Sequence, residues 1–170
     1  MRPVLVLVAV LGLAGSATAD QHGNSSAADV AAVRAVAAAF RSAIQTKDEA
    51  AFRALFVAGP VVWQGVDSKA IRAAERPSGG STPDLAPADS PASFIRDIAR
   101  HPGRTDESMA NIRVTTDGVI AAVSFDFVYS RDGRPLNRGL ECWHLLNTAA
   151  GWRIASVVWS NHRPAAGRTN

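Results

Sequence analysis

The first half of the chain carries apolar residues at helical spacing. Between residues 26 and 45, apolar side chains recur every three or four positions and form one stripe: Val30, Val33, Ala37, Phe40 and Ile44. Ser26 and Asp29 form a capping-box pattern at the start of this stretch. The pattern predicts an amphipathic helix over residues 26–45.

A second capping-box pattern follows almost without a loop. Thr46 and Glu49 predict the start of a short helix whose apolar residues are Phe52, Leu55 and Phe56. Gly59 and Pro60 are expected to end this helix. Because so few residues connect the two helices, we expect the chain to turn sharply and the helices to pack against each other.

A β-rich stretch begins at residues 61–63, and a third helix follows later. Residues 75–91 are dense in Pro, Gly, Ser and Ala, which is typical of a surface loop. Ser90 then predicts an N-cap, with Pro91 in the first turn. The helix would bury three apolar residues and end at the Pro-Gly pair after them: Phe94, Ile95, Ile98, and then Pro102 and Gly103.

The hydrophobic period changes to two in the second half. Strands are predicted at 111–116, 119–130, 136–147 and 152–161, with Asp117-Gly118 as a hairpin turn between the first two. In the second of these strands the odd positions are apolar: Val119, Ala121, Val123, Phe125, Phe127 and Tyr129. Since side chains alternate across a sheet, this face should point to the core. Helices segregated from an antiparallel meander predict an α+β domain.

The N-terminus has the three-part pattern of a cleaved secretory signal. A charged start precedes an apolar run over residues 4–13 and an A-x-A sequence, Ala17 to Ala19. The run is too short for the roughly 20 residues that a membrane-spanning helix needs. We therefore expect a periplasmic or secreted protein cleaved after Ala19, with no membrane attachment afterwards. The expected organisation is a signal peptide (1–19), a flexible leader (20–27), one domain (28–162) and a flexible tail (163–170).

Charge and cysteine content narrow the function classes. The formal net charge is only +3, and the arginines are spread singly, so nucleic-acid binding is not expected. His101, His144 and His162 lack metal-ligand spacing, and neither a metal nor a cofactor is expected. Cys142 is the only cysteine, which excludes an internal disulfide. It is expected to be a small buried apolar residue, with a reactive thiol or an intersubunit bridge as alternatives.

Four segments resemble a known superfamily in their order and spacing. "TKDEAAFRALF" (residues 46–56) resembles the second-helix signature of the nuclear transport factor 2-like (NTF2-like) superfamily, also called SnoaL-like or DUF4440-like. "ECWHLLNTAAGWRIASVVWSN" (residues 141–161) is similar to its closing hairpin. "SPASFIRDIAR" and "FDFVYSRDGRPLNRG" resemble an exported bacterial subgroup, some of whose members carry a lumazine-binding label. The resemblance covers about residues 28–162 and implies a cone in which a curved sheet surrounds a pocket.

The resemblance also allows one activity to be tested. Aligned on the second-helix segment, the general-base aspartate of ketosteroid isomerases falls at Gln64, and their oxyanion-binding tyrosine falls at Phe40. An amide cannot take the proton and a phenyl ring has no hydroxyl, so this isomerase chemistry is not expected unless Asp67 replaces the base. No catalytic residue is assigned.

The candidate ligand-binding residues are aromatic or acidic. Flat rings at a pocket wall can stack on an aromatic or heterocyclic ligand. Asp126 should face away from the core, toward solvent or a partner subunit, and is included because its segment "FDF" resembles that of the exported subgroup. By the same resemblance Glu141 lines the pocket, with a solvated or salt-bridged carboxylate at the strand edge as the alternative. Trp152 is instead expected in the core. Glu141 and His144 lie three apart on a strand and should face opposite sides of the sheet. The expected ligand-binding set is Trp63, Asp126, Phe127, Tyr129, Glu141, Trp143 and Trp159.

Three hypotheses remain open. The first is a module that binds a small, aromatic or heterocyclic molecule without transforming it. The second is an enzyme of the isomerase, dehydratase or cyclase type that uses a pocket carboxylate or histidine. The third is assembly into a homodimer through the outer sheet face, on which Ser124, Val128, Cys142 and His144 are expected to lie.

Overall fold

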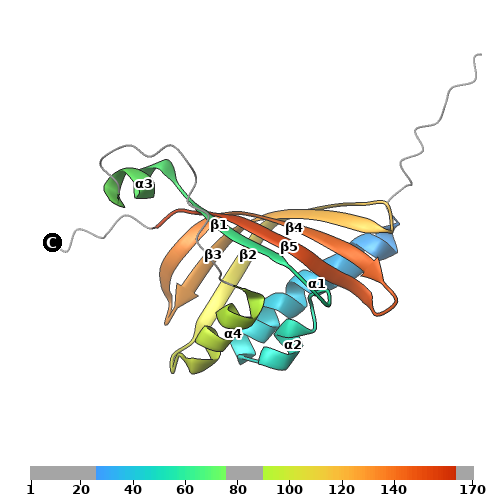
Figure 1. Cartoon of the computed structure of the whole chain (residues 1–170), viewed down its shortest axis with the longest axis horizontal. Coiled ribbons are helices and arrows are strands. Elements are labelled where there is room, and N and C mark those ends of the chain that lie inside the picture. The colour runs from blue at the N-terminus through green and yellow to red at the C-terminus, as the bar shows by residue number, and fades with distance from the viewer. Residues whose placement is uncertain (1–25, 76–89, 164–170) are drawn as a thin grey trace, which may run out of the picture.

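The computed structural model describes residues 26–75 and 90–163. These residues form a curved sheet with helices on one face (Figure 1). The predicted signal peptide and nearly all of the predicted leader and tail lie outside the described residues. Within the described residues, no helix is both long and apolar enough to cross a membrane.

Helix α1 (Ala27–Thr46) forms as the apolar stripe predicts. The Ser26 hydroxyl accepts a hydrogen bond from the backbone N–H of Asp29, 3.0 Å away, which satisfies one unpaired donor of the first turn. The helix ends at Lys47, whose φ of 59° is left-handed. Its buried face consists of Val33, Ala37, Phe40, Ala43 and Ile44.

Helix α2 (Glu49–Arg53) is present, but the predicted cap is wrong. Thr46 is the last residue of α1, and its hydroxyl donates to the Ser42 carbonyl. The N-cap is Asp48, whose carboxylate accepts from the backbone N–H of Ala51 at 2.9 Å. Asp48 is the better cap because α1 continues through Thr46, and only after Lys47 does the backbone become extended.

The third predicted helix is confirmed, and one helix was missed. Helix α4 (Pro91–Arg100) is capped by Ser90 together with Ser93. Helix α3 (Lys69–Glu75) was not predicted. The predicted loop over 75–91 is therefore too long at both ends, and its residues 76–89 lie outside the described part of the chain.

The five strands form one sheet in the order β1-β5-β4-β3-β2. The antiparallel meander runs as predicted through β2 (Thr105–Thr116), β3 (Ile120–Arg131), β4 (Arg134–Thr148) and β5 (Gly151–Asn161). Strand β1 (Val62–Asp67) pairs in parallel with β5, which makes the sheet mixed. Strand β2 begins at Thr105 rather than at residue 111, so the sequence missed its first half.

The alternation predicted for β3 is confirmed. Ala121, Val123, Phe125 and Phe127 are buried, and Tyr129 is half-buried at the end of this face. Val119 is exposed because it belongs to the preceding turn rather than to the strand. This register places the odd residues of β3 and β4 on the concave, helix-covered face.

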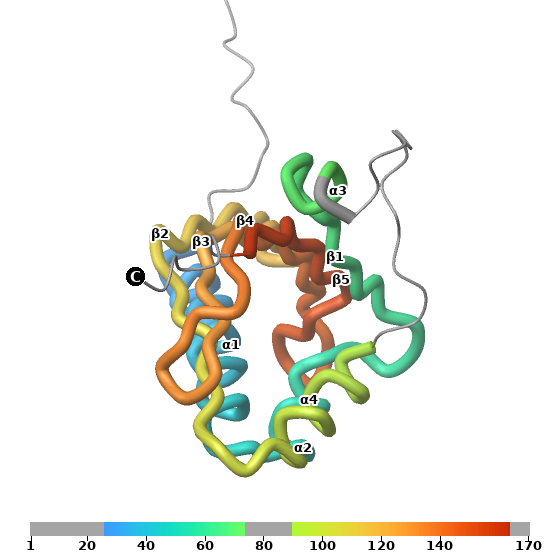
Figure 2. Tube along the Cα trace, turned by 90° about the vertical axis from the view of Figure 1, so that its left-hand side faces the viewer, coloured from blue at the N-terminus to red at the C-terminus, as the bar shows by residue number. Residues whose placement is uncertain are grey.

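Aromatic packing fills the deep part of the cone. The ring centroid of Phe40 lies 4.7 Å from Phe52 and 4.8 Å from Trp143, and Trp143 contacts Phe125 edge-on at 5.0 Å. Figure 2 shows the arrangement end-on, with the sheet curved over α1 on one side and α2 and α4 closing the other. Trp152 is buried in this core, as the sequence predicts.

The corrected cap of α2 gives a direct test. Replacing Asp48 with Ala removes the acceptor for the Ala51 N–H, and it should lower the free energy of unfolding by about 1 kcal/mol. The matched control is Thr46→Ala, which removes only an exposed hydroxyl bond to the preceding turn and should change stability by less than about 0.5 kcal/mol. Urea unfolding curves of the two variants measure the difference. An equal or larger loss for Thr46→Ala would contradict the assignment of the cap.

Candidate functional site

A small cavity opens on the concave face of the sheet, beside α4. Its volume is about 90 Å³. The sheet register brings its lining together: Glu107 pairs with Tyr129, Tyr129 with Asn137, and Glu141 with Trp159 on neighbouring strands. The lining residues are Trp63, Phe94, Glu107, Phe127, Tyr129, Asn137, Glu141 and Trp159.

Five of the seven predicted ligand-binding residues line this cavity, and three lining residues were not predicted. The five are Trp63, Phe127, Tyr129, Glu141 and Trp159. Phe94 was expected only as a buried helix residue. Glu107 was missed because its strand was expected to begin later. Extending the period-two pattern backwards through Met109, Glu107 and Thr105 would have placed the carboxyl on the concave face.

Trp143 and Asp126 do not line the cavity. Trp143 shares a face with Glu141 but lies deeper, where the cone narrows, and it is 1% exposed between Phe40 and Phe125. Asp126 lies on the opposite face of β3 and accepts a hydrogen bond from the Asn111 amide at 2.7 Å. The expected pocket position of Trp143 is therefore corrected, whereas Asp126 faces away from the core as the strand alternation predicts.

Aromatic rings form the walls of the cavity. The Trp63 ring centroid lies 5.3 Å from Phe94 and 5.2 Å from Trp159, with interplanar angles of 52° and 62°. Phe94 also approaches Tyr129, at 5.9 Å. Gly65 permits the position of Trp159, because a Cβ there would lie 2.8 Å from the indole ring. The rings therefore pack against one another at angles rather than face to face, and together they form the wall of the cavity.

Asn161 holds part of the cavity wall in place. Its side-chain oxygen accepts from Trp159 Nε1 at 2.9 Å and from the Asn137 amide at 2.6 Å. Its own amide donates to Asp67 at 2.9 Å. Asp67, the alternative base considered from the sequence, is engaged in this network and does not line the cavity.

Two carboxyl groups are buried at the cavity. Glu107 is 5% exposed and Glu141 is 3% exposed. Glu141 Oε1 accepts from Trp143 Nε1 at 2.5 Å, whereas Glu107 Oε1 is buried without a hydrogen-bond partner. Trp63 Nε1, a donor, is also buried without a partner. An unpaired buried polar group costs about 1–3 kcal/mol, so these atoms call for a water or a ligand.

Burial changes the proton affinity of both carboxyls. Desolvation raises the pKa of Glu141 to about 7, although the hydrogen bond from Trp143 opposes the shift. Desolvation also raises the pKa of Glu107 well above its ordinary value, and the negative charges of Glu141 and Asp106 raise it further. Near neutral pH the two groups together therefore carry less than the full charge of two exposed glutamates.

Tyr129 adds a hydroxyl at the cavity. Its oxygen accepts from Arg131 Nε at 3.2 Å, and the guanidinium carbon lies 5.8 Å from the centre of the ring. Burial raises the pKa of Tyr129, while Arg131 opposes that rise. The hydroxyl therefore keeps its proton at neutral pH and can donate it to a hydrogen bond.

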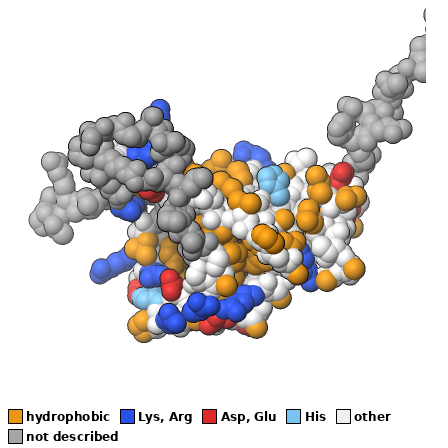
Figure 3. Space-filling view, in the orientation of Figure 1, with side chains coloured by type: hydrophobic (Ala, Val, Ile, Leu, Met, Phe, Trp, Pro, Cys, Tyr) orange, Lys and Arg blue, Asp and Glu red, His pale blue; other side chains and the backbone are white. Residues whose placement is uncertain are grey.

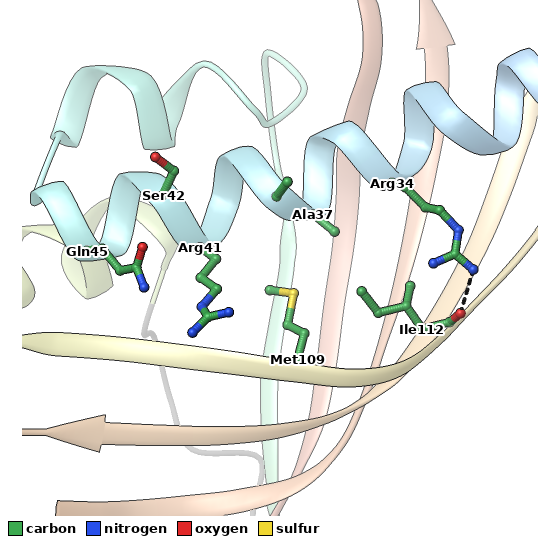
Figure 4. Close-up of a pocket in the computed structure, with 8 residues that line it drawn as sticks. Arg34, Ala37, Arg41, Ser42, Gln45, Met109 and Ile112 are labelled. Atoms are coloured by element: carbon green, nitrogen blue, oxygen red, sulfur yellow. Dashed lines mark hydrogen bonds between the residues drawn. The ribbon is translucent and has the colours of Figure 1, made fainter. Parts of the chain in front are cut away.

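A larger groove of about 390 Å³ lies elsewhere, between α1 and β2 (Figure 4). Its floor is apolar, and its two arginines are already engaged. Arg41 forms two hydrogen bonds with Asp106, at 2.8 and 2.9 Å, and Arg34 donates to the Ile112 carbonyl at 2.8 Å. These bonds join the helix to an edge strand. The groove is therefore a weaker candidate site than the cavity with the buried glutamates.

Among the described residues, no histidine lines the cavity. His144 lies on the outer sheet face, opposite Glu141 as predicted, and bonds Ser156 at 2.8 Å. His101 approaches Asp132 at 3.2 Å. In residues 26–75 and 90–163, no group of three or more His, Cys, Asp or Glu side chains is arranged to hold a metal ion.

The outer face of the sheet carries the other residues singled out from the sequence. Ser124 pairs with Cys142, and Val128 pairs with Arg138, on the face away from the cavity. Cys142 is half-buried rather than buried. Figure 3 shows hydrophobic side chains among polar ones over the strands, and basic side chains along the lower edge where α2 and α4 lie. Homodimer formation through the outer face stays a prediction.

Comparisons with known proteins identify the fold. The sequence matches no protein-family model and no curated protein. An NTF2-like protein with a cystatin-like fold from Novosphingobium aromaticivorans shares 17% identity at a TM-score of 0.56, over 82% of this chain and 85% of that one.

Two further solved structures carry functional names. One is a candidate dehydratase of the NTF2-like family from Streptomyces avermitilis, with 16% identity and a TM-score of 0.57 over 81% of this chain and 98% of that one. The other is the β subunit of a candidate aromatic-ring-hydroxylating dioxygenase from Novosphingobium aromaticivorans, with 16% identity and a TM-score of 0.60 over 82% and 94%. At these identities the likeness concerns the fold alone, and the chain has the NTF2-like fold, an α+β cone of helices on a curved five-stranded sheet.

Proposed function

We propose that this domain binds a small aromatic or heterocyclic molecule in the cavity beside α4. The observation that carries the proposal is a ring-walled cavity with two buried, unpaired polar atoms, Trp63 Nε1 and Glu107 Oε1. Apolar walls with a few fixed polar groups are typical of small-molecule sites. A ligand that accepts from the indole N–H and meets the Glu107 carboxyl would satisfy both atoms.

The size of the cavity limits the ligand. A closed apolar cavity of roughly 150 Å³ holds benzene. The volume of about 90 Å³ is smaller, because the rings of Trp63, Phe94 and Trp159 narrow the space. We therefore propose that one small ring or headgroup enters the cavity and that the rest of a larger ligand extends outward.

Glu141 favours a second candidate function, proton transfer to or from a bound substrate. A carboxyl whose pKa is raised to about 7 can donate and accept protons near neutral pH, which general acid–base catalysis requires. The enzyme type would be an isomerase, dehydratase or cyclase. Trp143 fixes the orientation of this carboxyl from the core side.

The ligand proposal is tested first by titration. Addition of aromatic heterocycles, with lumazine and flavins in the panel, should quench or shift the tryptophan fluorescence, because Trp63 and Trp159 line the cavity. For any ligand that binds, Trp63→Phe keeps a ring but removes the N–H donor, and calorimetry should find affinity about five- to tenfold weaker. The control is Trp152→Phe, a core residue outside the cavity, which should retain wild-type affinity. A panel that leaves the fluorescence unchanged would remove the proposal.

The buried carboxyl of Glu141 gives a pH-dependence prediction. Its folded-state pKa is raised from 4.5 to about 7, so the folded state binds the proton more tightly than the unfolded state does. Stability should be highest below about pH 4.5 and should fall as the pH rises through 7. The shift corresponds to a loss of about 3 kcal/mol in the free energy of unfolding.

Glu141→Gln keeps an acceptor for Trp143 and removes the titration. Urea unfolding at pH 5 and pH 8 should show a clearly smaller loss of stability for this variant than for the wild type. Glu49→Gln, which changes an exposed carboxyl on α2, is the matched control. It should lose as much stability between pH 5 and pH 8 as the wild type does. An equal loss of stability between pH 5 and pH 8 in Glu141→Gln and the wild type would contradict the raised pKa of Glu141.

We also propose export to the periplasm or the medium, which the N-terminal sequence pattern supports. Expressed from its full sequence in a bacterial host, the recovered protein should begin at Asp20. N-terminal sequencing measures this directly, and a chain that retains residues 1–19 would refute cleavage.

A further inference from the structure

We propose that the cavity selects a small organic cation, a quaternary or protonated amine held between the carboxyls of Glu107 and Glu141 and the rings of Trp63, Phe94 and Trp159. The inference rests on the proposed function, because it names the ligand class of the same cavity. It goes further in assigning a charge to the ligand and a role to the two carboxyls.

The charged residues that line the cavity are acidic. Two buried carboxyls line it, and none of the described lining residues is Lys or Arg. Of the nearby cations, Arg41 pairs with Asp106 on β2, and Arg131 donates to the Tyr129 hydroxyl without lining the cavity itself. An anionic ligand would meet like charge, whereas a cation would supply the counter-charge that the site lacks.

The ring geometry also suits a cation. The faces of aromatic rings attract cations within about 6 Å, and several rings at angles form a cage for an ammonium group. Trp63 contacts Phe94 and Trp159 at 52° and 62°, and all three rings line the cavity, so a cation inside it would lie against aromatic rings. Arg131 already lies over the Tyr129 ring at 5.8 Å, which leaves the other three rings to the ligand.

The unpaired oxygen of Glu107 supports the same assignment. Glu107 Oε1 has no donor, although a buried carboxylate is stable only when it is paired or hydrogen-bonded. Without a cation, burial keeps the two carboxyls partly protonated. A bound cation would favour their ionised forms, so binding should release protons and strengthen as the pH rises.

Other charged groups act near the cavity. Asp106 on β2 adds negative charge near Glu107, while Asp97 on α4 and Arg131 on β3 act in opposite directions on the pKa of Tyr129. The cavity measures about 90 Å³, less than the roughly 150 Å³ of a cavity that holds benzene, so only the charged end of the ligand would lie inside it.

A matched pair of probes tests the charge alone. Choline and its uncharged carbon isostere 3,3-dimethylbutan-1-ol have nearly the same shape, and choline keeps its charge at every pH. At pH 8 and constant ionic strength, calorimetry should show choline binding at least tenfold more tightly than the alcohol. Repeating the titration in buffers of different ionisation enthalpy should reveal proton release with choline and none with the alcohol. Choline affinity should fall when the pH is lowered to 5.5.

Glu107→Gln tests the residue. The amide keeps the shape of the side chain but cannot become negative, so the preference for choline should fall severalfold, with Glu141 left as the second carboxyl, while affinity for the alcohol does not fall. Glu49→Gln, on the exposed face of α2, should behave as the wild type. Circular dichroism and a single cooperative unfolding transition establish that each variant is folded.

The outcomes separate this inference from the proposed function. If the alcohol binds as tightly as choline, or if aromatic heterocycles bind and choline does not, the cation assignment is wrong and the binding function stands. If neither probe nor any member of the heterocycle panel binds, both proposals fail. A choline preference that is undiminished in Glu107→Gln would also overturn the role given to that carboxyl.

Discussion

The aromatic packing around Phe40 determines how much of the cone remains open. A strongly curved sheet leaves a concave face that its own side chains cannot fill, and α1 presents Phe40 to that face. The ring of Phe40 contacts Phe52 on α2 and Trp143 on β4, so one side chain joins both helices to the sheet. Removing a buried ring of this kind costs about 3–5 kcal/mol. The cavity is the part of the concave face that this packing does not reach.

The same aromatic packing determines which of the two buried glutamates receives a hydrogen bond from the core. Trp143 is held between Phe40 and Phe125, and its indole N–H can therefore reach only toward the cavity, where it meets Glu141. One oxygen of Glu141 is thus satisfied from the core, while Glu107 receives no such donor. The two glutamates are similarly buried but not equivalent, and the unsatisfied one is the group that a ligand would stabilise most.

The elements determined by local sequence were predictable. The stripe and cap of α1, the cap of α4 and the alternation in β3 depend on residues close together in the chain, and each is confirmed. The parallel pairing of β1 with β5 joins residues about ninety positions apart, and no local pattern encodes it. The start of β2 was missed because Thr105 and Glu107 are polar, yet both are buried on the concave face. Glu107 was therefore absent from the predicted site.

The cavity residues could be predicted only in part from the alternation of side chains along the strands. The alternation of side chains correctly placed Glu141 and Trp143 on the same face of the sheet. It does not predict how deeply each side chain lies below the helices. Trp143 lies in the core and Glu141 lines the cavity, although the two residues are only two positions apart. Depth depends on where the helices cross the sheet, which follows from the packing of Phe40 rather than from the strand sequence.

Proton transfer and cation binding require different ionisation states of the two buried glutamates. Proton transfer needs a carboxyl that exchanges its proton near neutral pH during turnover, and a raised pKa near 7 provides that only while the site stays free of a fixed positive charge. A bound cation would lower that pKa and hold the carboxyls ionised as counter-charges. The pocket rings would stabilise such a cation, whereas they offer nothing specific to a migrating proton. The combination of angled rings, two carboxyls and engaged arginines therefore favours holding a charged ligand over transforming a neutral one.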